Sequence, residues 1–104
     1  MKTDAVYAAQ ILEALDRIDL YLLGVDATAF LGDSMRQDAV TRQLEVIGEA
    51  VRRLSGDFCD ARPGVPWRAI IGLRNRLAHD YIGIDMTIVW EVTQVDLPRL
   101  RDVL

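Results

Sequence analysis

The sequence has very little of what disulfide and metal sites need, since its 104 residues include one cysteine, Cys59, and one histidine, His79. A lone cysteine cannot form an intrachain disulfide, which fits a reducing cytoplasm, and no neighbouring residue would depress its pKa. No zinc-binding spacing of cysteines and histidines exists. The composition therefore excludes a disulfide scaffold and a structural zinc site, and we expect no cofactor.

Basic charge and long apolar runs are also scarce. The formal net charge of −4 excludes a general nucleic-acid binder that works through charge alone. No apolar run approaches the roughly 20 residues of a membrane span, and residues 1–10 do not resemble a signal peptide. Hydrophobic residues nevertheless make up 51% of the chain, which favours an oligomer. We expect a cytoplasmic protein without membrane contact that folds as one domain over residues 1–104.

Apolar residues recur at steps of three and four along four segments, which predicts four helices, and no segment shows strand alternation. The first helix should begin after Thr3 and end near Leu23, where Gly24 suits a helix C-terminus. Its apolar residues form two stripes: Tyr7, Ile11, Ala14, Ile18 and Tyr21, then Ala8, Leu12, Leu15 and Leu22. The second helix should span about Met35 to Leu54, capped by Asp33 or Ser34. Its stripe is Val40, Leu44, Ile47, Val51 and Leu54.

The remaining half of the chain predicts two more helices. The third should run from Pro66 to His79 or Asp80, and the fourth should begin near Met86 with Asp85 as its cap. The fourth helix carries an expected buried stripe of Ile88, Val92 and Val95, and an expected kink or restart at Pro98. Residues 26–30 are expected to form a short turn and residues 55–66 a loop. Together these elements predict an all-α antiparallel four-helix bundle.

Two features of the second predicted helix suggest that other groups lie close to it. Gly48 lies in its middle at a cost of about 1 kcal/mol relative to Ala, which indicates close approach of another group within the bundle or across a dimer. Glu45 and Glu49 lie one turn apart, but no histidine accompanies them on this helix. A solvated or interface pair is therefore favoured over a metal site.

Residues 67–81, with the sequence WRAIIGLRNRLAHDY, concentrate the groups that can carry chemistry. Ile70, Leu73 and Leu77 face a core, so the polar residues occupy the rest of the helix. An imidazole can exchange protons with hydroxyl groups, and a guanidinium can stabilise charge on a phosphate. Arg74 and His79 would thus suit metal-free transesterification at an RNA phosphodiester. The alternative is a helix end with basic residues near its dipole and a structural histidine.

The spacing of Arg74 and His79 raises a geometric problem. Five residues correspond to about 140° around an ideal helix, so one copy cannot easily aim both side chains at one small target. Two copies meeting across a symmetry axis could do so, and so could a helix that unwinds near His79. Arg68, Arg74 and Arg76 are the expected local basic patch for an otherwise acidic chain.

The Arg74-x4-His79-x-Tyr81 spacing within LRNRLAHDY resembles the motif of HEPN-domain toxins, specifically the HepT family. The segments RQLEVIGEAV (residues 42–51) and PGVPWRAIIGLRNRLAHDY (residues 63–81) are similar to the second and third helices of that family. Residues 96–98 fit its last helix. The resemblance covers nearly the whole chain.

The resemblance implies a homodimeric, metal-independent endoribonuclease that acts as the toxin of a toxin–antitoxin pair, with a selective RNA substrate such as tRNA. It implies that Arg74 and His79 are catalytic and that Asn75, Arg76 and Tyr81 contact substrate. It also implies a minimal nucleotidyltransferase antitoxin that adds AMP to Tyr81. From spacing alone, Tyr81 could instead be a core residue continuing the stripe of Leu77.

Two other functions remain open at this point. The same bundle could be a non-catalytic module that docks a nucleotidyltransferase and presents a nucleotide or substrate to it. A purely structural helical adaptor would account for the wide apolar stripes, but it leaves the cluster of Arg74, Asn75, His79 and Tyr81 unexplained.

Overall fold

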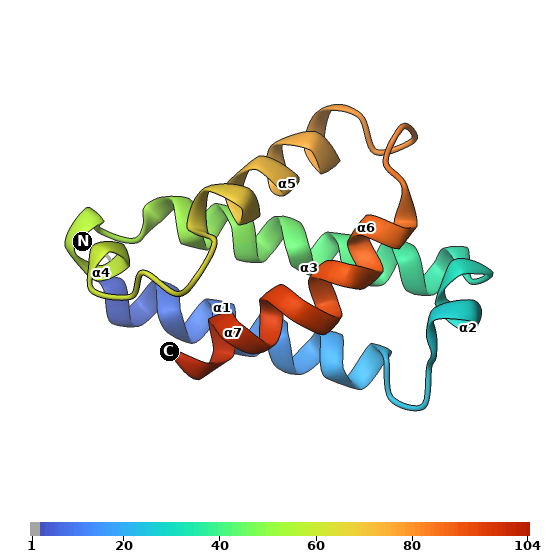
Figure 1. Cartoon of the computed structure of the whole chain (residues 1–104), viewed down its shortest axis with the longest axis horizontal. Helices are drawn as coiled ribbons and strands as arrows, with labels where there is room; N and C mark the ends of the chain where they lie inside the picture. Colours follow the sequence, from blue (N-terminus) through green and yellow to red (C-terminus); the bar gives the residue numbers. More distant parts are fainter. Residues whose placement is uncertain (1–2) are drawn as a thin grey trace.

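The computed structural model describes residues 3–104, and this part of the chain consists of helices and their connections, with no strand (Figure 1). Met1 and Lys2, the first two of the ten residues that do not resemble a signal peptide, lie outside the described residues. The longer elements are α1 (Asp4–Tyr21), α3 (Ser34–Arg53), α5 (Trp67–His79) and a composite of α6 (Met86–Glu91), the π-helix η1 (Val92–Asp96) and α7 (Leu97–Asp102). Two short helices, α2 (Ala27–Leu31) and α4 (Gly56–Asp60), lie in the connections.

The four long segments run in alternating directions, with α3 between α1 and α5 and with α7 against α1 (Figure 1). The all-α antiparallel four-helix bundle that the sequence predicts is therefore confirmed. Arg101 of α7 binds Asp16 and Asp19 of α1 at 2.9 and 2.7 Å, which fixes the C-terminal segment to the first helix. None of the described helices is both long and apolar enough to cross a membrane.

The first helix ends slightly earlier than predicted, at Tyr21, and Gly24 follows it with a positive φ of 73°. This left-handed conformation carries no steric penalty for glycine, so Gly24 suits the turn as expected. Thr3 lies at the N-cap position, but its carbonyl rather than its side chain accepts the amides of Val6 and Tyr7. Both apolar stripes face the core, which includes Ile11, Ala14, Leu15 and Ile18 as buried residues.

The core lies along α3, where the structure confirms all five residues of the predicted stripe as buried: Val40, Leu44, Ile47, Val51 and Leu54. Burying an aliphatic side chain of this size contributes about 1.5–3 kcal/mol. Asp33, and not Ser34, caps the helix, since its carboxylate accepts the amide of Arg36 at 3.1 Å. The start and the rotation of α3 are therefore fixed, and α3 provides the surface on which α5 packs.

Gly48 is a point of close approach between α3 and α5. A Cβ built on Gly48 would lie 2.7 Å from Cγ of Arg74 and 3.4 Å from the carbonyl oxygen of Ile70. The neighbour that the sequence predicts for this glycine is therefore in the same chain. Gly48 lets the Arg74 side chain cross directly over the backbone of α3.

The segment between α3 and α5 is more ordered than the expected loop, because it contains α4. Ser55 caps this helix by accepting the amide of Phe58 at 3.1 Å. The Asp4 carboxylate accepts both the amide and the hydroxyl of Ser55, at 2.8 and 2.6 Å. These hydrogen bonds lower the pKa of Asp4, the hydroxyl contributing most. The start of α1 thus holds the connection that leads to α5.

The predicted stripe of the fourth helix is wrong by about one residue. Ile88 and Val95 are 39% and 43% exposed, whereas the buried residues are Val89, Thr93, Leu97 and Leu100. Thr93 can take a buried position because its hydroxyl donates to the carbonyl of Trp90 at 2.6 Å. Apolar periodicity does not count such a threonine as a core residue. The prediction therefore places the neighbouring face of the helix in the core.

The interruption expected at Pro98 occurs earlier, in the π-helix that precedes α7. A π-helical turn changes the hydrogen-bond spacing and the rotation of the residues after it. Pro98 then lies in the first turn of α7, where the missing amide hydrogen is no disadvantage. Asp85 caps α6 as predicted, since its carboxylate accepts the amide of Thr87 at 2.9 Å.

Candidate ribonuclease site on helix α5

The orientation of α5 is set at its start and along one face. The Trp67 indole donates to the carbonyls of Cys59 and Arg62, at 3.2 and 3.0 Å. Ile70, Leu73 and Leu77 are buried against α3. Because this stripe fixes the rotation of the helix, every other side chain of α5 points in a defined direction. The helix also continues through His79, so it does not unwind before the histidine.

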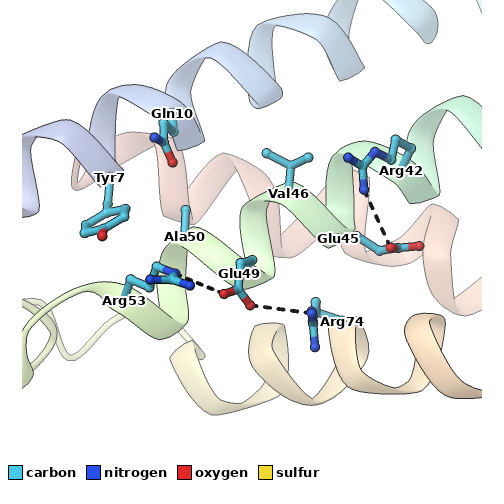
Figure 2. Close-up of a pocket in the computed structure, with 9 residues that line it drawn as sticks. All are labelled: Tyr7, Gln10, Arg42, Glu45, Val46, Glu49, Ala50, Arg53 and Arg74. Carbon is cyan, nitrogen blue, oxygen red and sulfur yellow. Dashed lines mark hydrogen bonds and ion pairs between the residues drawn. The ribbon is translucent and has the colours of Figure 1, made fainter. Parts of the chain in front are cut away.

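Arg74 lies half-buried beside α3, with 31% of its side chain exposed. Its Nη2 is 3.5 Å from Oε2 of Glu49, and its Nη1 donates to Oδ1 of Asn75 at 3.2 Å. Its Nε is buried and has no hydrogen-bond partner among residues 3–104. Both terminal nitrogens of the guanidinium therefore have a partner while the side chain stays partly exposed, and Figure 2 shows the contact with Glu49.

Glu49 is shared among three arginines. Arg52 Nη2 and Arg53 Nε lie 2.7 and 3.0 Å from Oε1, in addition to the contact with Arg74. The hydrogen bonds of Arg52 and then Arg53 lower the pKa of Glu49 to about 2. One carboxylate facing three guanidinium groups leaves a local positive charge in a chain of net negative charge. Of the two explanations for Glu45 and Glu49, the structure supports an ion-paired surface at Glu49.

Arg74 lines a hollow of about 440 Å³, and Figure 2 shows the side chains around it. Its walls come from α1, α3 and α5, and it is lined by Tyr7, Gln10, Arg42, Glu45, Val46, Glu49, Ala50, Arg53 and Arg74. Asn75, His79 and Tyr81 do not line it. The guanidinium and the imidazole of the motif therefore do not share this hollow within one chain.

His79 is the last residue of α5 and is exposed. In the described part of the chain it makes no hydrogen bond and no ion pair with another side chain. Its position does not match a buried structural histidine. The exposed side chain remains accessible to a substrate or to another protein surface.

The three arginines of the expected basic patch do not lie together. Arg74 lines the hollow against α3, whereas Arg76 lines a separate apolar groove and Arg68 is exposed near the start of α5. Asn75 is exposed, and its carbonyl oxygen is occupied by Arg74. The positive charge around Arg74 instead comes from Arg52 and Arg53.

The apolar groove has a volume of about 490 Å³ and lies between α5 and the composite fourth segment. Its lining consists of Leu44, Ala69, Ile70, Gly72, Leu73, Arg76, Ile88, Val92, Asp96 and Leu97. Ile88 and Val92, which were expected in the core, thus line a groove at the surface of the bundle. Core residues of α3 and α5 form the floor of this groove.

Tyr81 lies two residues beyond the end of α5, where the chain turns back toward α3. Its ring is half-buried against the core, and its hydroxyl donates to Oδ1 of Asp38 in α3. Burial, followed by the hydrogen bond to Asp38, raises the pKa of the phenol, while Thr41 acts in the opposite direction. The ring of Tyr81 packs on the core, as the spacing from Leu77 predicts, while its hydroxyl lies at the surface, as a role in binding would require.

Sequence reasoning missed two groups of partners. Arg52, Arg53 and Asp38 lie on α3, far from the motif in sequence, and their importance depends on how α5 packs. Gly48 was the available signal for Arg74, because a glycine inside a helix marks a close neighbour. Asp38 carries no such signal, since an exposed aspartate on a helix usually only faces water.

Among the described residues, no group of three or more His, Cys, Asp or Glu side chains is arranged to hold a metal ion. Burial raises the pKa of the Cys59 thiol, the charges of Asp4 and Asp60 contributing in the same direction, so the thiolate is disfavoured. The chemistry available on α5 and in the turn after it is therefore that of an exposed imidazole, a held guanidinium and a phenol.

The fold and the site together define a class of protein. Its members are all-α bundles that carry an arginine, a histidine and a tyrosine at the end of one helix. Comparison with protein families matches residues 11–104 to the model described as ribonuclease HepT-like. The chain belongs to this HepT-like ribonuclease family, which confirms the resemblance found in the motif. The comparison with solved structures found no significant match.

Individual relatives agree with this assignment. The chain is 36% identical over 95 residues to a probable ribonuclease HepT of Thermococcus cleftensis, covering 91% of this chain and 86% of that protein. It is 38% identical over 91 residues to a candidate RNase of Methanocaldococcus jannaschii, covering 88% and 84%. A candidate RNase of Caldanaerobacter subterraneus is 35% identical over 101 residues, covering 97% and 90%. Ribonuclease activity is thus the function named across the family.

Proposed function

We propose that this protein is a metal-independent endoribonuclease and the toxin of a toxin–antitoxin pair. The observation that carries the proposal is the Arg74-x4-His79-x-Tyr81 motif at the end of α5, in a chain of the HepT-like ribonuclease family. The arginine is held against α3, the histidine is exposed, and the tyrosine hydroxyl lies at the surface.

The reaction begins when His79 removes the proton from a ribose 2′-OH, which attacks the adjacent phosphorus. Arg74 stabilises the charge that develops on the phosphate oxygens, and the protonated imidazole returns a proton to the leaving 5′-oxygen. The products are a 2′,3′-cyclic phosphate and a 5′-OH. Asn75, exposed on α5, contacts the same RNA strand, and Arg76 contacts it from the edge of the separate apolar groove.

The experiment is RNA cleavage by the purified protein in excess EDTA, with the new ends identified chemically. Cleavage that leaves a 2′,3′-cyclic phosphate and that is lost in His79→Ala supports the proposal. Intact RNA, together with nucleotide-dependent binding of a nucleotidyltransferase, would favour the non-catalytic module instead. A selective substrate such as tRNA should be cleaved before bulk RNA, because the chain carries net negative charge.

A homodimer completes the site in this proposal. Arg74 lines one hollow and His79 lies outside it, so a second copy is needed to bring an imidazole and a guanidinium to one phosphate. The apolar groove with Ile88 and Val92 is the surface that the second copy covers, through an interface in which each copy uses the same patch.

Light scattering at micromolar concentration tests the dimer. Twice the 11.7 kDa mass of one chain is expected for the wild type. Ile88→Asp should shift the protein toward monomer and lower the cleavage rate. Val95→Asp is the matched control, because Val95 is similarly exposed on the same segment but does not line the groove. A wild type that remains monomeric would contradict the shared site.

The antitoxin in this proposal is a minimal nucleotidyltransferase that adds AMP to the hydroxyl of Tyr81. The added phosphate brings negative charge and bulk to the rim of a site that receives RNA phosphate. Intact-mass analysis after co-expression with the partner should show whole AMP increments that are absent in Tyr81→Phe. Increments on Tyr7 or Tyr21 would move the modification elsewhere.

A further inference from the structure

Within residues 3–104, the Tyr81 hydroxyl donates to one carboxylate, that of Asp38, which lies 43 residues away in the sequence. Asp38 lies in the second turn of α3, and its Oδ1 accepts the phenol proton. No arginine or lysine within residues 3–104 forms an ion pair with Asp38. The Asp38 carboxylate therefore contacts the phenol and is not neutralised by a cation among the described residues.

The surroundings of this pair are built so that the hydroxyl stays at the surface. The ring of Tyr81 packs against the core, while its bond to Asp38 is exposed to solvent. Asp80 accepts the amide of Gly83 at 3.3 Å, which closes the turn after Tyr81. Ile82 at the tip of that turn is 97% exposed. A partner enzyme can reach the phenol oxygen without opening the bundle.

We propose that Asp38 is the proton acceptor for nucleotidyl transfer to Tyr81, an inference that rests on the function proposed above. The phenol oxygen attacks the α-phosphorus of a nucleoside triphosphate bound by the partner. A bond forms between this oxygen and the phosphorus, the bond from the α-phosphorus to the bridging oxygen breaks, and pyrophosphate leaves. The phenol proton passes to the Asp38 carboxylate and then to water.

A proton acceptor is needed because the free phenol is a weak nucleophile. The pKa of Tyr81 lies above its ordinary value of 10, so almost no phenolate exists at neutral pH. The proton must therefore leave during the transfer, and a carboxylate hydrogen-bonded to the hydroxyl is positioned to accept it. Protein kinases use an aspartate in the same way when a substrate hydroxyl attacks phosphorus.

Asp38→Asn separates proton transfer from positioning. The asparagine carbonyl still accepts the phenol hydrogen bond, but the amide cannot accept the proton. With purified nucleotidyltransferase partner at saturation, Mg²⁺ and ATP, we expect the turnover rate for AMP addition to fall by about 10²-fold or more. The concentration of protein that gives the half-maximal rate should change little. Asp60→Asn on α4 is the matched control and should behave as wild type.

The pH profile provides a second readout that a purely structural role would not change. The wild-type rate should be nearly flat from about pH 6 to 8, because the proton acceptor is a side chain of the protein and not hydroxide from the solvent. In Asp38→Asn the proton must go to solvent, so the rate should rise about tenfold per pH unit toward the phenol pKa. Thermal unfolding followed by circular dichroism verifies that the variant is folded.

The outcomes distinguish this inference from the function on which it rests. Equal turnover of wild type and Asp38→Asn, or a change confined to the half-maximal concentration, would overturn the role of Asp38 alone. A wild type that takes up no AMP, or AMP that persists in Tyr81→Phe, would remove the proposed antitoxin mechanism together with it. A slow Asp38→Asn with a rising pH profile supports both.

Discussion

Arg74 and His79 lie on the same helix but in opposite kinds of environment. Arg74 is half-buried between α3 and α5, with a carboxylate, an amide oxygen and a second helix around it. His79 is at the helix end, exposed, and without a side-chain partner in the described residues. Arg74 is therefore held by its neighbours within the chain, whereas His79, the proposed proton-transfer group, is held by no side chain among residues 3–104.

This difference identifies which part of the proposed site the single chain provides. A held guanidinium can stabilise charge without reorganising during the reaction. An imidazole that no residue orients needs the substrate or a second copy to select its rotamer and its tautomer. The following variants test the contrast, beginning with the largest expected effect.

His79→Ala should cause the largest loss, about 10²- to 10⁴-fold in the RNA cleavage rate, because it removes the proposed acid and base. The free energy of unfolding should remain near the wild-type value, since His79 is exposed and buries nothing. Cleavage assays and urea unfolding measure the two effects. Unchanged cleavage by this variant would sink the enzymatic interpretation of the motif.

Arg74→Lys should lower the cleavage rate by about 10²-fold, although the positive charge remains. A single ammonium cannot contact Glu49 and Asn75 and also bind a phosphate with two parallel hydrogen bonds. Arg52→Lys is the control, because Arg52 binds Glu49 but lies outside the motif. If both lysine variants lose activity equally, the effect belongs to the ion-pair cluster and not to Arg74.

Gly48→Ala should destabilise the protein by a net 1–2 kcal/mol or so. The new Cβ would overlap the Arg74 side chain, and overpacking typically costs about 1–3 kcal/mol, partly offset by the better helix propensity of Ala. Gly56→Ala is the control, because nothing lies within 4 Å of its added Cβ and Gly56 does not line the apolar groove. That variant should be as stable as wild type or more stable, which chemical unfolding would verify.

Glu49→Gln should have the smallest effect, visible mainly in acid. The folded-state pKa of Glu49 lies at about 2, below its ordinary value of 4.5, so its contribution to stability is complete above about pH 4.5 and disappears as the pH falls toward 2. The variant should therefore lose less stability than wild type over this range. Urea unfolding at several pH values measures it, and high salt should reduce the difference.

The sequence by itself determined the elements and much of their burial. The stripe of α3 and the cap at Asp85 follow from local rules, because helical spacing and capping depend on residues a few positions apart. The motif Arg74, His79 and Tyr81 is likewise local, and so its location at the end of α5 could be predicted. The buried face of the fourth helix could not, since Thr93 is buried through a hydrogen bond that apolar spacing does not reveal.

Only the tertiary structure decided what each motif residue contacts. Glu49 meets Arg74 because α5 packs over Gly48, and Asp38 meets Tyr81 because the turn after α5 folds back onto α3. Both contacts join residues that are distant in sequence and polar, and neither leaves a periodic signal. Pairing across helices depends on the rotation and separation of packed elements, which the whole core determines together.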